Sequence, residues 1–134
     1  MGNRISTNLR PQGGATLPTA LLALFLAVSA LGLGQAAAAS RAETLFYRAE
    51  RCEQDLHRSG TRHKYRHHWL RCIEKFKTVY QADPDGLWAA AGLFKAGDLY
   101  RELARWSGWQ SDRREAADFF QRVVNRFPIV SLSM

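Results

Sequence analysis

The chain has little cysteine and no catalytic motif, and these absences exclude several classes of protein. Only two cysteines occur in 134 residues, and neither histidine nor cysteine follows Cys72, so the second half of the chain cannot assemble a zinc centre. The serines at 59, 107 and 111 lack the Gly-x-Ser-x-Gly elbow, and no glycine-rich phosphate loop is present. The sequence therefore predicts no enzyme, no catalytic residue and no cofactor.

Histidine offers only a weak alternative as a metal ligand. All four histidines cluster around the first expected loop, without a carboxylate between the pair at i and i+4. A zinc site usually adds a carboxylate or thiolate to its imidazoles. The cluster consists of His57, His63, His67 and His68. We interpret it as part of a basic loop and predict no metal site there.

Acidic residues are absent from residues 1–39, where Arg4 and Arg10 are the only charges. An uncharged apolar run from Leu17 to Leu33 and then small residues up to Ala39 complete the pattern of a cleavable signal peptide. We place cleavage after Ala39. The alternative is an uncleaved anchor, but this run is shorter than the roughly 20 residues of a spanning helix.

The route and destination follow from two further absences. No cysteine stands at the cleavage site to accept a lipid, and no twin arginine precedes the apolar run, which favours the Sec route. We expect a periplasmic or cell-envelope protein with no membrane span after cleavage. Residues 40–134 keep 17 basic against 12 acidic side chains, a net charge of about +5. For an exported chain this favours anionic envelope material over nucleic acid, with a solvated basic surface as the alternative.

Strict alternation of apolar residues is also missing, and a 3.6-residue period predicts an all-α fold. Helices are expected at about 42–57, 66–81, 87–104 and 113–126, and the one short strand candidate is Ile129–Val130. Asp112 and Glu115 have the spacing of a capping box at the start of the fourth helix. Pro84 and Pro128 are expected to end the second and fourth helices.

One pattern occurs twice with an offset of 44 residues, as a small residue, an aromatic residue, an aliphatic residue and a proline. It predicts two helix–loop–helix units, about 42–84 and 86–128, that stack to bury their apolar faces. Two units are few for a repeat array, so we expect marginal stability or dimerisation. The matched positions are Cys72, Phe76, Val79 and Pro84 in the first unit and Ala116, Phe120, Val123 and Pro128 in the second.

The spacing of these residues resembles a tetratricopeptide repeat. Leu93, Ala96, Gly97 and Tyr100 fall where that repeat places its large apolar residue, its next apolar position, its small residue and its tyrosine. The departure is the loop inside each unit, which we expect to be longer than the family's tight turn, so that the period is 44 rather than about 34.

Two stretches, 64–76 and 88–93, also resemble the non-catalytic N-terminal repeat region of exported bacterial N-acetylmuramoyl-L-alanine amidases. This resemblance implies a chain that corresponds to the front of such an enzyme, without its zinc-binding amidase domain. We therefore expect a truncated or shifted relative of that family.

The repeat resemblance also implies a disulfide. An even number of cysteines in an oxidising compartment is consistent with pairing. In a tetratricopeptide hairpin the small residues of the two helices pack together; Cys72 occupies the second such position, and Cys52 lies at or one turn from the first. The alternative is two buried free thiols.

Two tryptophans differ from the other aromatic residues because they flank Ser107-Gly108 in an expected exposed loop. Together with nearby arginines they are candidates to contact a sugar ring or a partner peptide, unless the loop folds back and covers the core. The candidates are Trp106, Trp109, Arg105, Arg113 and Arg114. The sequence thus leaves two functions open, a periplasmic scaffold that binds a partner protein and a module that localises an amidase to peptidoglycan.

Overall fold

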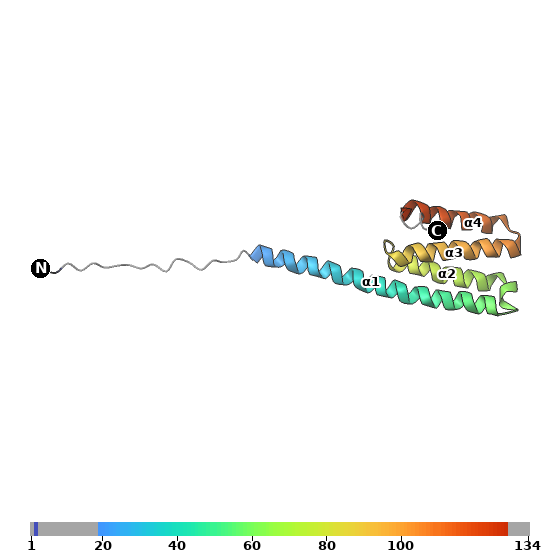
Figure 1. Ribbon diagram of the computed structural model, residues 1–134, viewed down its shortest axis with the longest axis horizontal. Coiled ribbons are helices and arrows are strands. Elements are labelled where there is room, and N and C mark those ends of the chain that lie inside the picture. Colours follow the sequence, from blue (N-terminus) through green and yellow to red (C-terminus); the bar gives the residue numbers. More distant parts are fainter. Residues whose placement is uncertain (1, 3–18, 129–134) are drawn as a thin grey trace. The chain divides into compact units, whose positions relative to one another are not determined.

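The structure, a computed structural model, describes residue 2 and residues 19–128, with side chains from Gly34 onward, and Figure 1 shows its helices. This part of the chain contains no strand, which confirms the all-α prediction. The elements are α1 (Thr19–Arg58), the short 3-10 helix η1 (Arg62–Lys64), α2 (Arg66–Ala82), α3 (Leu87–Ser107) and α4 (Gln110–Arg126).

The chain divides into two compact units, residues 1–32 and 33–134. The expected start of the first helix at Ala42 is wrong, since α1 begins at Thr19. Leucine and alanine dominate this stretch, and both favour helix. Arg4 and Arg10 of the expected signal segment lie outside the described residues, as does the expected strand at 129–130; cleavage after Ala39 stays a prediction.

Within the described residues, no helix combines the length and apolarity needed to cross a membrane.

Proline ends two of the helices as expected, but the capping box is wrong. α2 and α4 each end two residues before a proline, Pro84 and Pro128. Gly108 caps α3 in the left-handed conformation with φ of 70°, where its N–H donates to the Ala104 carbonyl, and a residue without Cβ takes this conformation at least cost. Asp112 lies inside α4, because the helix begins at Gln110, and its side chain makes no cap.

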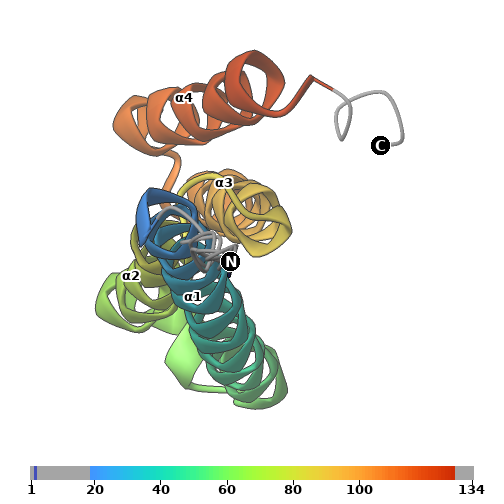
Figure 2. The ribbon, with the colours of Figure 1, turned by 90° about the vertical axis from the view of Figure 1, so that its left-hand side faces the viewer.

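The four helices of residues 33–134 lie side by side, and each runs antiparallel to its neighbour in the chain (Figure 1). Viewed along the helices, α3 lies between α4 and the α1–α2 pair (Figure 2). Two glycines of α3 permit this close packing: a Cβ at Gly92 would lie 2.9 Å from the Phe76 carbonyl oxygen on α2, and one at Gly97 would lie 3.0 Å from the Phe120 ring on α4. The two faces of α3 are thus fitted to different neighbours.

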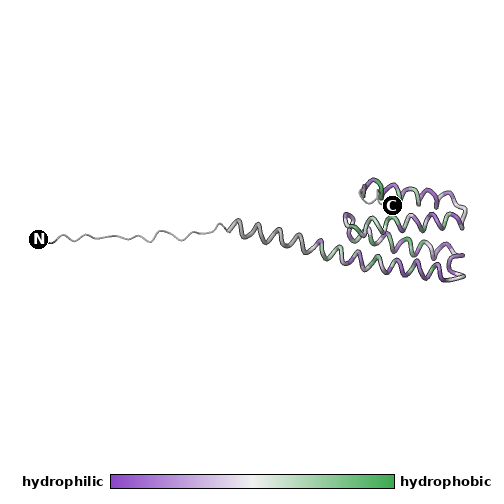
Figure 3. The backbone as a smooth tube through the Cα atoms, viewed as in Figure 1, coloured by the Kyte–Doolittle hydropathy of each residue, from purple (hydrophilic) through white to green (hydrophobic). Residues whose placement is uncertain are grey.

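From Gly34 onward, hydrophobic and hydrophilic residues recur along each helix, as the colours along the tube in Figure 3 show. The apolar face of α2 is buried, with Phe76 and Val79 fully inaccessible to solvent. Phe120 of α4 matches Phe76 in the repeat pattern but is only half-buried. Its neighbour Phe119 enters the core instead. The 44-residue pattern therefore predicts the helix but not the side chain that it buries.

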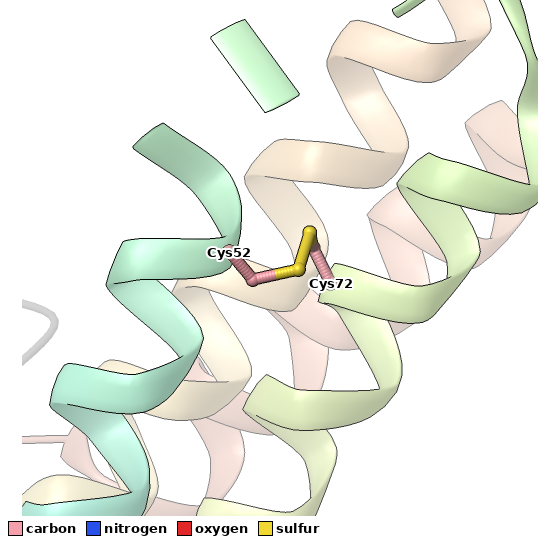
Figure 4. Close-up of a disulfide and its surroundings, with 2 residues drawn as sticks. All are labelled: Cys52 and Cys72. Atoms are coloured by element: carbon pink, nitrogen blue, oxygen red, sulfur yellow. A yellow bond between two sulfur atoms is a disulfide. The ribbon is translucent and has the colours of Figure 1, made fainter. Parts of the chain in front are cut away.

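The expected pairing of Cys52 with Cys72 is present as a disulfide that joins α1 to α2 (Figure 4). The two Cα atoms are 5.5 Å apart, within the range that a disulfide spans. The bond joins the last two turns of α1 to the middle of α2 and holds the two helices in register.

The connection within the first pair of helices is long, as expected, but the connection within the second pair is short. α1 and α2 are joined by residues 59–65, which include η1, whereas α3 and α4 are joined by Gly108 and Trp109 alone. The prediction of a long loop in the second unit is wrong. The residues expected in that loop belong instead to α3 and α4, which have 21 and 17 residues.

Candidate binding site at the α3–α4 junction

Both tryptophans singled out from the sequence lie at the turn from α3 to α4. Trp106 is in the last turn of α3 and Trp109 directly precedes α4. Their side chains are 64% and 56% exposed, so they do not fold back to cover the core. An exposed indole costs free energy in water, so two of them close together indicate a contact surface.

The two indoles belong to one pocket of about 230 Å³, here called the tryptophan pocket. Its other walls come from η1 and its flanks and from the end of α3, so that residues 40 positions apart in the chain share one site. The lining residues are His63, Lys64, Arg66, Leu103, Trp106, Ser107 and Trp109.

One cationic or titratable side chain accompanies each indole. The guanidinium of Arg66 lies over the Trp109 ring, 4.6 Å from its centroid, in a cation–π arrangement. The ring centroids of His63 and Trp106 are 4.9 Å apart. His63 is oriented by its Nδ1, which donates to the Ser59 carbonyl oxygen at 2.8 Å.

Arg66 and Ser107, which line this pocket, both bind the buried carboxylate of Asp112. Arg66 Nη1 donates to Asp112 Oδ2 at 2.5 Å, and the Ser107 hydroxyl donates to the same oxygen at 2.7 Å. Ser107 Oγ also accepts the Trp109 backbone N–H at 3.1 Å, which connects the indole to the ion pair. Asp112 is fully buried, and its Oδ1 accepts no hydrogen bond within the described residues.

The pKa of Asp112 records this environment. Burial alone would raise that pKa, but the hydrogen bonds from Arg66 and Ser107 and the positive charge of Arg66 outweigh it, so the pKa lies below its ordinary value. The carboxylate therefore stays charged and holds Arg66 in place against the face of the Trp109 ring.

The predicted arginines do not join this pocket. Arg105 and Arg113 line a separate apolar groove of about 370 Å³ between α3 and α4, with Arg101, Ala104, Ala116, Ala117 and Phe120. Arg114 is exposed and lines neither site. The structure thus divides the cluster that the sequence joined, because side chains three or four residues apart share a helical face while adjacent ones do not.

Sequence reasoning missed the partners of the tryptophans that come from the first half of the chain. His63 was counted in a basic loop, and Lys64 and Arg66 were noted only within the amidase-like run. The sequence signal for these partners was the basic character of residues 62–68. That character does not predict which part of the fold the segment contacts. Across the described residues, no three His, Cys, Asp or Glu side chains gather closely enough to hold a metal ion.

Compared with protein-family models, with curated proteins and with solved structures, the chain shows no significant match. Its class is therefore defined by its own features, an all-helical chain with one disulfide and an exposed pocket of indoles and cations.

Proposed function

We propose that this protein is an exported, non-catalytic helical-repeat module that binds the cell wall through the tryptophan pocket. The observation that carries the proposal is the pairing of two largely exposed indoles with Lys64 and Arg66 in one pocket. Indole rings stack on the apolar faces of sugar rings, and the adjacent cations complement the carboxylates that cell-wall material carries.

The repeat character of the proposal is supported by how the helices pair. Each of the two hairpins is antiparallel, and α3 packs against both the preceding and the following helix (Figure 2). This is the arrangement that a tetratricopeptide-like pair, 42–84 and 86–128, requires in order to bury its apolar faces. Helical repeats serve many functions, so the binding function depends on the pocket rather than on the fold.

Export is supported by the signal-like pattern of residues 1–39 and by the disulfide, since disulfides persist in oxidising compartments. Export and the resemblance to amidase repeat regions together favour peptidoglycan as the wall component that the chain binds. We propose that the chain supplies localisation and that it performs no hydrolysis of its own.

A sedimentation assay with purified insoluble peptidoglycan tests the proposal. The wild-type chain should co-sediment with the wall, and Trp106→Ala/Trp109→Ala should reduce its affinity about tenfold or more, because both stacking surfaces are lost. Lys64→Gln should flatten the dependence on salt concentration, because one screened charge contact is removed.

The matched control is Tyr47→Ala/Leu87→Ala, which also removes two exposed apolar side chains but lies away from the pocket. This control should bind like the wild type. Absence of co-sedimentation at low salt, or an equal loss in both double variants, would reject wall binding through the pocket.

A second candidate, a scaffold that binds a partner protein, is favoured by the groove between α3 and α4. This groove exposes Ala117 and Phe120 between arginines, which suits an acidic amphipathic helix. Fluorescence anisotropy of a labelled acidic amphipathic peptide, with Phe120→Asp as the disrupted variant, separates this function from the first.

A further inference from the structure

A second pocket, of about 250 Å³, lies between α1 and α2 beside the disulfide, and neither candidate function uses it. Here it is called the basic pocket, because most of the side chains around it are cationic. Its charged side chains are Arg48, Arg51 and Asp55 from α1, Arg62 from η1, and Arg71 and Lys75 from α2.

The two helices contribute the same spacing of residues to this pocket. Counted from its own cysteine, each helix lines the pocket at positions −4, −1, 0 and +3: Arg48, Arg51, Cys52 and Asp55 on α1, and His68, Arg71, Cys72 and Lys75 on α2. Because the helices are antiparallel and joined at position 0 (Figure 4), the two rows are related by an approximate two-fold axis through the disulfide. Arg51 and Arg71 are equivalent under this symmetry.

The charges of the pocket are strongly unbalanced. Five permanent cations line it, and Asp55 is its one carboxylate. Among the described residues, none of the five cations forms an ion pair, whereas four arginines outside the pocket bind carboxylates, as Arg126 does with Asp85 at 2.9 Å. The positive charge in the pocket is therefore available to a ligand.

His68 also lines the pocket, and nearby cations contribute to the shift of its pKa. Its pKa is lowered, first by desolvation and then by the positive charges of Arg71 and Arg62 nearby. The imidazole can donate a hydrogen bond to an anion whether it is neutral or charged.

We infer that the basic pocket binds a diphosphate group, with Arg51 and Arg71 each holding one of its two phosphoryl groups. A planar guanidinium binds phosphate oxygens in a bidentate manner, which a lysine cannot do. Two equivalent guanidiniums match the two equivalent ends of a diphosphate. The small volume of the pocket favours so compact a group over an extended polymer.

The diphosphate can belong to a small water-soluble ester or to the headgroup of a lipid, and the recognition chemistry is the same for both. Binding is titrated calorimetrically with inorganic pyrophosphate, using the full-length, disulfide-bonded chain in non-ionic detergent micelles. We expect saturable binding at one site per chain. Arg51→Gln/Arg71→Gln should weaken it about 100-fold, because two charge-assisted contacts are lost. Both side chains are exposed, so the variant is expected to fold.

The matched control is Arg105→Gln/Arg114→Gln, which removes the same charge from exposed arginines outside the pocket. It should change the affinity by no more than about twofold, since distant exposed charges are screened. An equal loss in both double variants, no saturable binding of pyrophosphate, or equally tight binding of citrate would each overturn the inference.

Two further titrations distinguish the sources. Uridine diphosphate represents the soluble ester and farnesyl diphosphate represents the lipid headgroup. The ligand with the higher affinity identifies the source. Binding of either ligand should depend on Arg51 and Arg71. Trp106→Ala/Trp109→Ala should leave pyrophosphate binding unchanged, so failure of wall binding and failure of this inference are separate results.

Discussion

The α1–α2 and α3–α4 hairpins are held together by different means. A disulfide joins α1 to α2, where five cations face one pocket and repel one another. α3 and α4 carry no such bond; they pack through aromatic rings around Gly97, as where Tyr100 stacks on Phe119 with centroids 5.8 Å apart. The covalent bond therefore lies beside the larger cluster of cations, whereas the hairpin with fewer clustered cations is held by apolar contact.

The largest expected difference between the hairpins concerns two phenylalanines that the repeat pattern makes equivalent. Phe76→Ala should lower the free energy of unfolding by about 3–5 kcal/mol, because it leaves a cavity at a fully buried position. Phe120→Ala should cost about 1–2 kcal/mol, since that ring already faces solvent in part. Chemical denaturation with urea measures both.

Phe119→Ala is the control for this comparison. Phe119 is on the same helix as Phe120 but is only 4% exposed, so its loss should resemble that of Phe76. If the Phe76 and Phe120 variants lose equal stability, burial does not distinguish the hairpins and the repeat pattern is energetically symmetric.

The second prediction removes the covalent bond. Cys52→Ser/Cys72→Ser should lower stability by about 3 kcal/mol, the loop-entropy value for 20 residues. Because repulsion between the pocket cations is then unopposed, added salt should stabilise this variant more than the wild type. Thermal melts at two salt concentrations measure both effects.

A reducing agent provides the internal control, because it should destabilise the wild type and leave the variant unchanged. Hydrogen exchange should quicken in α1 and α2 more than in α4. Uniform quickening over all helices would mean that the bond stabilises the protein as a whole and not the charged hairpin.

Sequence periodicity predicted those features that depend on residues near one another in the chain. The ends of α2 and α4 followed from Pro84 and Pro128, because proline acts on its own neighbours. The cysteine pairing came from the repeat resemblance, which aligned Cys72 with the small residue of a hairpin. These predictions required no knowledge of how the two hairpins meet.

Features that depend on residues far apart in the chain could not be predicted from the sequence. Asp112 has the local pattern of a cap, yet its carboxylate binds Arg66, which lies 46 residues earlier. The equal spacing around the two cysteines is visible in the sequence, but it forms a pocket only because the disulfide sets the two rows side by side. Helical periodicity identifies a face of a helix and does not identify the side chains that it will meet.

The third prediction concerns the ion pair that connects the two hairpins. Asp112→Asn should cost about 2 kcal/mol, because a buried charge-assisted hydrogen bond is worth about 1.5–3 kcal/mol and Arg66 is partly exposed. The pKa of Asp112 is lowered in the folded state, so its contribution is fully present above the ordinary value of 3.8 and is lost as the pH falls through the lower folded value.

Stability measured from neutral pH to below 3.8 therefore separates the charge from the shape of this side chain. The difference between wild type and Asp112→Asn should be constant at neutral pH and shrink once the wild-type carboxylate takes up a proton. Glu74→Gln, which removes an exposed carboxylate that binds Lys77, should leave stability unchanged within error. If the two stability curves stay parallel to the lowest pH, Asp112 contributes through packing alone, and its charge does not hold α4 against the first hairpin.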